Sequence, residues 1–170
     1  MKRVMMLPAL AGLALLLVLT AAFAQEFKVK SKGTVTAAGS GAAEATVITG
    51  TVTVTVKGKL AVGPSTVKLT IKGKPGNKTE IKDKKTGKVN AYRYEGFDGT
   101  MTVTGEKYKI LVEGTGIKIS ANGAGQVAFS GTGTYSAVSG KKKKTGKWAP
   151  KSTPDYTVIP TPAPFGEIEM

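Results

Sequence analysis

The sequence predicts an all-β domain preceded by an export signal, and two observations support this fold class. Apolar and polar residues alternate with period two through most of the chain after Gln25, as expected for strands with one buried face. Valine and threonine, which favour strands, supply much of that alternation. Glycines interrupt it about every eight or nine residues: Gly41, Gly50, Gly58, Gly105, Gly114, Gly123, Gly131 and Gly140.

The N-terminus has the order of a secretory signal. Lys2 and Arg3 precede an apolar run over residues 4–18, and Ala22-Phe23-Ala24 is a small-x-small cleavage site. An uncut membrane anchor needs about 20 apolar residues and fits this run less well. We therefore predict residues 1–24 as a signal peptide cleaved after Ala24. The mature protein is expected to be secreted or periplasmic, with no transmembrane segment after cleavage.

The mature chain is basic and large enough for one domain. Residues 1–24 carry two of the 25 Lys and Arg and none of the 11 Asp and Glu, which leaves 146 residues with a formal charge of +12. A chain of this length can bury a core without disulfides. The sequence contains no cysteine, which also excludes a lipoprotein anchor. We assign residues 25–140 to the β domain.

The alternating runs define the strands and their inward residues. Each run places apolar residues at every second position and Thr, Ser, Lys, Glu or Asn between them. The inward sets are Val52, Val54 and Val56; Val67, Leu69 and Ile71; Tyr108, Ile110 and Val112; and Ile117, Ile119 and Ala121. A further hairpin is expected over residues 79–94, where Asp83 opens a turn and Gly87 closes it in a left-handed conformation.

Glycine-containing turns of standard length would keep all these apolar residues on one face. Two-residue turns fit Gly50-Thr51 and Gly105-Glu106, and three-residue turns fit residues 123–125 and 131–133. Counting the runs predicts an antiparallel meander of about ten short strands. Because one open sheet of that width would leave long exposed edges, we expect a sandwich or a closed barrel.

A β-solenoid is the alternative fold. Coils of about 17 residues would place Phe129 over Leu111 or Glu113, and Tyr135 over Ile117 or Lys118. Only one of the two possible offsets between successive coils places like side chains above each other. For that reason we favour the meander.

The composition changes after Gly140. Lys141 to Lys144 form an unbroken basic run, and five of the eight prolines fall between Pro150 and Pro164. We expect residues 141–170 to form a Lys-rich and then Pro-rich tail, extended and flexible. The alternative is that Trp148, the only tryptophan, closes one end of the domain as part of a last short strand.

The mature chain has no histidine and no cysteine, which excludes Ser-His-Asp and Cys-His nucleophiles and most transition-metal sites. The compact acidic segment Glu95 to Gly99 is interpreted as a turn, since two carboxylates fall short of a calcium site. We therefore predict no catalytic residue, no metal and no cofactor. A carbohydrate-active enzyme that uses two carboxylates stays an alternative.

Two groups of residues are candidates for binding. The first is an aromatic and basic patch that could contact a sugar or a partner: Tyr92, Arg93, Tyr94, Phe97, Lys84 and Lys85. The tyrosines could equally fill a second core. The second group is the lysine run, whose members could contact a polyanion: Lys141, Lys142, Lys143 and Lys144. Lysines also serve solubility and the protection of sheet edges, which is the simpler interpretation.

These observations predict a secreted, non-enzymatic β domain with a structural, adhesive or envelope-associated role and weak affinity for anionic polymers or glycans. Nucleic acid is not expected as a partner, because basic residues are not interleaved with stacking aromatics. A barrel that carries a small apolar ligand is the alternative from a different class.

Overall fold

The computed structural model describes residues 28–149 and 162–169, and every regular element in these ranges is a strand. The all-β class is therefore confirmed. The strands are β1 (Lys28–Ser31), β2 (Gly33–Gly63), β3 (Lys68–Lys74), β4 (Asn77–Lys82), β5 (Val89–Ser139), β6 (Lys142–Lys147), β7 (Pro162–Phe165) and β8 (Glu167–Glu169). The predicted signal peptide and most of the Pro-rich segment lie outside the described residues.

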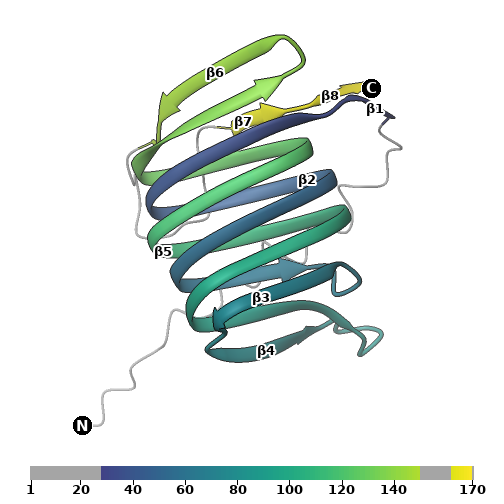
Figure 1. Ribbon diagram of the computed structural model, residues 1–170. Coiled ribbons are helices and arrows are strands. Elements are labelled where there is room, and N and C mark those ends of the chain that lie inside the picture. The colour runs from purple at the N-terminus through teal and green to yellow at the C-terminus, as the bar shows by residue number, and fades with distance from the viewer. Residues whose placement is uncertain (1–27, 150–161, 170) are drawn as a thin grey trace, which may run out of the picture.

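Two long antiparallel strands, β2 and β5, wind together in a flattened coil (Figure 1). Most residues of β2 pair with two residues of β5, one on each side. Val35, for example, pairs with both Ala121 and Ala137. This double pairing requires β5 to pass β2 twice, so that each turn of β2 lies between two turns of β5.

Shorter strands complete the two ends of the coil (Figure 1). At one end, β3 pairs with residues 98–104 of β5, and β4 pairs with residues 89–95. At the other end, β6 pairs with residues 134–139 of β5 after a tight turn at Gly140. Near this second end, β7 pairs with residues 125–128 of β5, and β8 pairs with β1.

The coil bends where glycines of neighbouring turns face each other. Gly41 pairs with Gly114 and Gly131, and Gly50 pairs with Gly105 and Gly123. All of these glycines except Gly105 have positive φ, for example +136° at Gly50 and +146° at Gly123. A Cβ added to Gly123 would lie 2.7 Å from the Cα of Gly50. The glycines are therefore required both by the backbone conformation and by the close approach of two chains.

The structure differs from the expected meander in its connections. The four predicted turns at Gly50, Gly105, Gly123 and Gly131 are not turns, because β2 and β5 run through them without a break. The sheet is not closed into a barrel. The winding corresponds to the solenoid alternative. Ala43 of β2 pairs with Val112 on one side and with Phe129 on the other, so that Phe129 lies above Val112 in the coil.

The core fills the interior of the coil, and the inward residues are largely those expected from the alternation. The second residue set, Val67, Leu69 and Ile71, is only partly buried beside the core. The other three sets, one of which includes Tyr108, are buried together with the large side chains of Phe97 and Phe129. The expected hairpin over residues 79–94 is confirmed, with Asp83 accepting hydrogen bonds from the backbone N–H groups of Lys85 and Thr86.

Part of the Lys-rich and Pro-rich segment is paired to the coil. Besides β6 and β7, Trp148 is 4% exposed and Phe165 is fully buried. This agrees with the alternative in which Trp148 closes one end, while the boundary at Gly140 stays a prediction. Within residues 28–149 and 162–169, no helix is long and apolar enough to cross a membrane.

Candidate binding face

One broad face of the coil carries a row of hydroxyl side chains that crosses seven neighbouring strand segments. Each residue of the row pairs directly with the next, and directly paired residues place their side chains on the same face. In spatial order from β6 to β3, the row is Thr145, Ser136, Thr36, Ser120, Thr53, Thr102 and Thr70. Every member is a threonine or serine, and none is buried.

Two flanking rows, each two residues along the strands from the first, complete a grid of 21 positions. One row is Lys143, Val138, Thr34, Asn122, Thr51, Thr104 and Lys68. The other is Lys147, Thr134, Ala38, Lys118, Thr55, Thr100 and Lys72. Thirteen of the 21 residues are Thr or Ser, five are Lys, and none is Asp, Glu or aromatic. We call these 21 residues the hydroxyl face.

The backbone holds this grid in regular order. Neighbouring strands lie about 4.8 Å apart, and alternate residues along a strand are separated by about 6.8 Å. Paired threonines also hydrogen-bond to each other across the strands. The hydroxyl oxygens are 3.0 Å apart for Thr51 and Thr104, and 2.8 Å apart for Thr55 and Thr100. Central side chains are therefore held in place before any ligand arrives.

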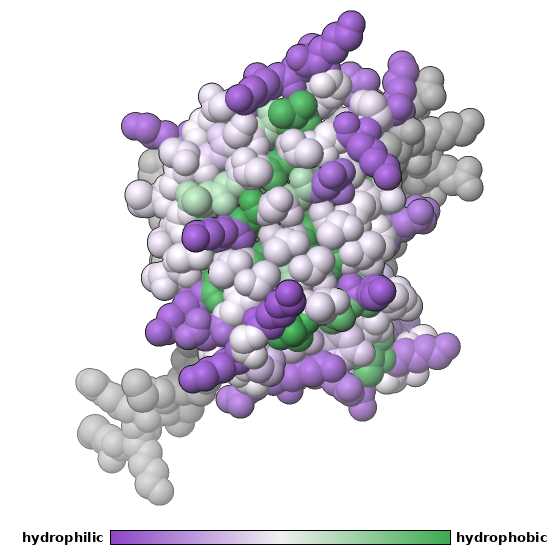
Figure 2. Space-filling model, in the orientation of Figure 1, coloured by the Kyte–Doolittle hydropathy of each residue, from purple (hydrophilic) through white to green (hydrophobic). Residues whose placement is uncertain are grey.

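The lysines of the hydroxyl face lie at its two ends and at its centre. Lys68 and Lys72 belong to β3, Lys143 and Lys147 belong to β6, and Lys118 lies in the middle turn of β5. Figure 2 shows this side of the molecule as a largely pale surface of intermediate hydropathy, with hydrophilic projections and small hydrophobic areas between the pale residues. The face thus combines neutral hydroxyl groups with positive charge.

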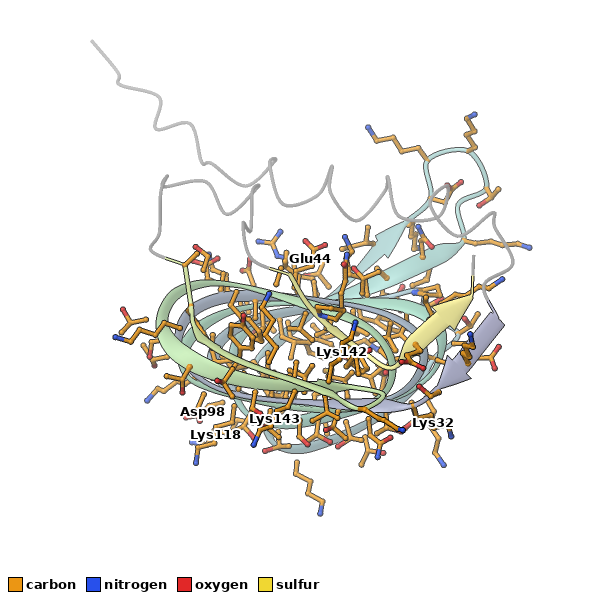
Figure 3. The ribbon with its side chains drawn as sticks, turned by 90° about the horizontal axis from the view of Figure 1, so that it is seen from above. Lys32, Glu44, Asp98, Lys118, Lys142 and Lys143 are labelled. Atoms are coloured by element: carbon orange, nitrogen blue, oxygen red, sulfur yellow. The ribbon has the colours of Figure 1, made fainter. Side chains whose placement is uncertain are left out.

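The opposite broad face has a different character. There Glu44 forms an ion pair with Lys109, and Arg93 forms one with Glu95. Seen along the coil axis, Glu44 lies on one side, and Lys118, Lys143 and Asp98 lie on the other (Figure 3). Asp98 is outside the grid and lies beside Lys57. The Glu44 side carries charges of both signs in these ion pairs, whereas the 21 residues of the hydroxyl face carry only positive charge. This asymmetry is the main reason to consider the hydroxyl face as a binding site.

A shallow groove of about 600 Å³ lies at the β6 end of the hydroxyl face. Five of its lining residues are Thr36, Thr134, Ser136, Thr145 and Lys147, and the other four are Ala37, Ala38, Tyr135 and Gly146. The threonines, the serine and the lysine all belong to the grid, and they come from three adjacent strand segments. The groove offers hydroxyl groups and one ammonium group to the same ligand.

The predicted aromatic patch is not gathered on one exposed surface. Tyr94 and Phe97 are buried and pack edge to face, with ring centroids 6.0 Å apart. Burial also raises the pKa of Tyr94. Tyr92 is partly buried at the end of the core, and the Nζ of Lys78 lies 3.8 Å from its ring centroid. The interpretation of these aromatics as core residues therefore fits Tyr94 and Phe97.

The basic members of that patch lie elsewhere. Arg93 is turned to the opposite side of β5 from Tyr94, where it pairs with Glu95. Lys84 and Lys85 are exposed in the turn that Asp83 organises. The hydrogen bonds from Thr86 and Lys85 hold the pKa of the Asp83 carboxyl below its usual value. The six residues thus fall into a core pair, a surface ion pair and a turn.

The lysine run from Lys141 to Lys144 divides between two roles. Lys143 is part of the hydroxyl face. Lys144 pairs with the buried Ala137, so its side chain leaves the strand on the core side, beyond the end of the coil. Figure 3 places Lys142 over the interior of the coil outline. Charges that point inward from an end strand oppose further strand addition, which supports the edge-protection interpretation for Lys142 and Lys144.

The carboxylates of the Glu95 to Gly99 segment are each close to a cation. Glu95 pairs with Arg93, and the Asp98 carboxylate lies 3.9 Å from the Nζ of Lys57. Within the described ranges, no group of three or more His, Cys, Asp or Glu side chains is placed to hold a metal ion.

Sequence reasoning missed the hydroxyl face as a site. Its signal was present in the run from Thr51 to Val56, where threonine occupies every outward position. However, the same pattern is typical of any exposed strand. Only the pairing shows that residues from β2, β3, β5 and β6 join in continuous rows.

Comparison with known proteins found no matching protein-family model, no matching curated protein and no matching solved structure.

Proposed function

We propose that this chain is an exported, non-enzymatic binding protein that attaches to anionic polymers or glycans of the cell envelope through its hydroxyl face. The observation that carries the proposal is the composition of the grid. Thirteen hydroxyl residues and five lysines make up most of the grid, and none of its 21 residues is a carboxylate. The acidic group of Asp98 also lies on this side, beside Lys57 at the border of the grid.

The chemistry of the face suits a ligand with carboxylate, sulfate or phosphate groups. Lysine ammonium groups attract anionic oxygens over several ångströms, and threonine and serine hydroxyls donate shorter hydrogen bonds to them. A single exposed lysine contributes little, about 0–1 kcal/mol. A repeating ligand makes many such contacts at once, and its total affinity rises through multivalency.

Edge protection explains only part of the lysine distribution. It accounts for Lys68 and Lys72 on β3 and for the lysines of β6, which are end strands. It does not account for Lys118, which lies on an interior turn of β5 between two turns of β2. Nor does it explain why the 21 residues of the hydroxyl face include five lysines and no acidic residue.

The two alternatives from other classes receive less support from the described residues. A carrier of an apolar ligand needs room inside the coil, where Tyr108, Phe97 and Phe129 are packed with less than 2% exposure. The groove of about 600 Å³ is instead open to the surface. A carboxylate-based enzyme needs an acid and a base beside one cleft. None of the residues that line the groove is an aspartate or a glutamate.

The test is binding of the mature protein to acidic polysaccharides, neutral polysaccharides, envelope extracts and liposomes at low and physiological salt. Lys118→Glu changes the charge of the hydroxyl face, and Lys59→Glu makes the same net change at an exposed position outside it. We expect Lys118→Glu to weaken binding to acidic polymers by at least tenfold and Lys59→Glu to change it much less. Equal losses in both variants would show that net charge alone is responsible, and would overturn the proposal.

A further inference from the structure

We infer that the ligand of the hydroxyl face is an acidic polysaccharide chain that lies across the strands, parallel to the coil axis, with about one sugar unit over each strand. This inference rests on the proposed function and makes it more specific. It commits to the chemistry, the direction and the length of the bound chain.

The shape of the grid sets the direction. Across the strands the rows contain seven residues, so that six intervals of about 4.8 Å give a length of about 29 Å. Along the strands the grid is only three residues wide, or about 14 Å. A long ligand therefore makes most contacts when it follows the rows. A sugar ring with its linkage is about as long as one strand interval, so successive units meet equivalent hydroxyl groups.

The positions of the lysines support the same direction. In the row that begins at Lys147, lysines occupy the first, fourth and seventh places, as Lys147, Lys118 and Lys72. Their separation is three strands each time, or about 14 Å. The other flanking row has lysines at both ends, Lys143 and Lys68. A chain that carries acidic groups along its length meets positive charge at both ends and in the middle.

The neutral residues of the face favour a polysaccharide over a polyphosphate. Threonine and serine hydroxyls both donate and accept hydrogen bonds, as sugar hydroxyls do, whereas phosphate oxygens only accept. The middle row consists entirely of such hydroxyls, from Thr145 to Thr70. None of the 21 positions is aromatic, which removes the stacking by which proteins hold neutral sugars and nucleic-acid bases. Acidic groups on the sugar are therefore needed for affinity.

The groove at the β6 end provides the place where one end of the chain is held best. It contains three hydroxyls of the middle row, those of Thr145, Ser136 and Thr36, and it includes Lys147. Binding that begins there extends toward Lys118 and then toward Lys72 along a continuous row. The affinity should therefore grow with chain length until the chain reaches β3.

The experiment measures binding of oligouronates of two to ten units by calorimetry at fixed low salt, with neutral oligosaccharides of equal length and short polyphosphate as comparisons. We expect affinity to rise steeply up to about seven units and then to level off. Lys118→Gln should lower the affinity for the heptamer about two- to fivefold. Lys59→Gln, which removes the same charge outside the face, should have little effect.

The direction of the chain is tested by NMR with methyl-labelled threonine. The heptamer should shift the signals of Thr36, Thr53, Thr102 and Thr70, which lie on four different strand segments of the middle row. Shifts confined to threonines of one strand segment would overturn the proposed direction.

The outcomes separate this inference from the proposed function. Binding to acidic polymers through the hydroxyl face without the rise in affinity up to seven units would overturn the inference and leave the proposed function standing. Tighter binding of polyphosphate than of the oligouronates would overturn the choice of polysaccharide. An absence of binding to every acidic polymer would overturn both.

Discussion

The indole ring of Trp148 stacks on the phenyl ring of Phe129, with ring centroids 5.1 Å apart and 19° between their planes. Phe129 in turn stacks on Tyr135 at 5.2 Å. The indole N–H of Trp148 donates a 3.1 Å hydrogen bond to the carbonyl oxygen of Thr134. These contacts attach the chain that follows β6 to the aromatic end of the core.

Replacing Trp148 by alanine should therefore destabilise the whole domain. Loss of a large buried aromatic side chain costs about 3–5 kcal/mol, and here a hydrogen bond is lost as well. Urea denaturation followed by circular dichroism measures the change in the free energy of unfolding. Lys147→Ala, at the adjacent exposed position, should change it by less than about 0.5 kcal/mol. A Trp148→Ala variant as stable as the parent would show that this contact does not contribute to the fold.

The facing glycines at the bends give a second prediction, which compares two substitutions. Gly123→Ala places a Cβ 2.7 Å from the Cα of Gly50, at a φ of +146°. Gly87→Ala has a positive φ of +69° but no atom within 4 Å of the new Cβ. We expect Gly87→Ala to cost roughly 1–2 kcal/mol from backbone strain alone. Gly123→Ala should cost clearly more or prevent folding, as judged by thermal denaturation. Equal costs would contradict the close approach of the two turns.

Tyr108 gives a prediction about alkaline pH. Its buried hydroxyl shares its one proton between the carbonyl oxygens of Gly50 and Val103, each at 3.2 Å. Burial raises its pKa above the usual value of 10.0. Above pH 10 the unfolded chain loses this proton while the folded chain keeps it. The free energy of unfolding should therefore fall as the pH rises beyond about 10.

The measurement for Tyr108 is urea denaturation between pH 8 and pH 11, in parallel for the parent and for Tyr108→Phe. Lysines titrate in the same range in both proteins, so the difference between the two pH profiles isolates the tyrosine. Tyr108→Phe should be less stable at pH 8, because two carbonyl groups lose a partner, and its stability should fall less steeply with pH. Parallel profiles would show that the Tyr108 pKa is the same in both states.

The end strands give a prediction about self-association. Lys142 and Lys144 lie on β6 at one end of the coil, and Lys144 emerges on the core side. Exchanging both for threonine leaves an unprotected strand edge, and we expect dimers or larger assemblies in light scattering at high protein concentration. Lys57→Thr with Lys118→Thr removes the same charge from interior strands and should stay monomeric. Association in both variants would attribute the effect to lower net charge.

The alternation of side chains predicted most of the core, and there is a physical reason why it did not predict the connections. A three-residue turn at residues 123–125 places Ala121 and Val127 on the same face. An uninterrupted strand places them on the same face too, because both positions are odd. The two topologies therefore bury the same residues. The alternation test that supported hairpins could not distinguish them from a continuous coil.

The candidate site was less accessible from the sequence than the core. Tyr92, Arg93 and Tyr94 form a conspicuous local cluster, yet alternation sends Arg93 to one face and Tyr94 into the core. The residues of the hydroxyl face are inconspicuous by comparison. Thr36, Ser120 and Thr53 are far apart in the sequence and become neighbours only through the winding of β2 and β5.

The sequence by itself determined the strand content, the inward residues and the bend positions, because period-two alternation, threonine and valine content and glycine placement are local properties. Only the tertiary structure decided that two long strands wind together and that their hydroxyls align in rows. Those features depend on which turn of β5 lies beside which turn of β2. Pairing between distant segments is set by the packing of the whole coil, and no single segment contains that information.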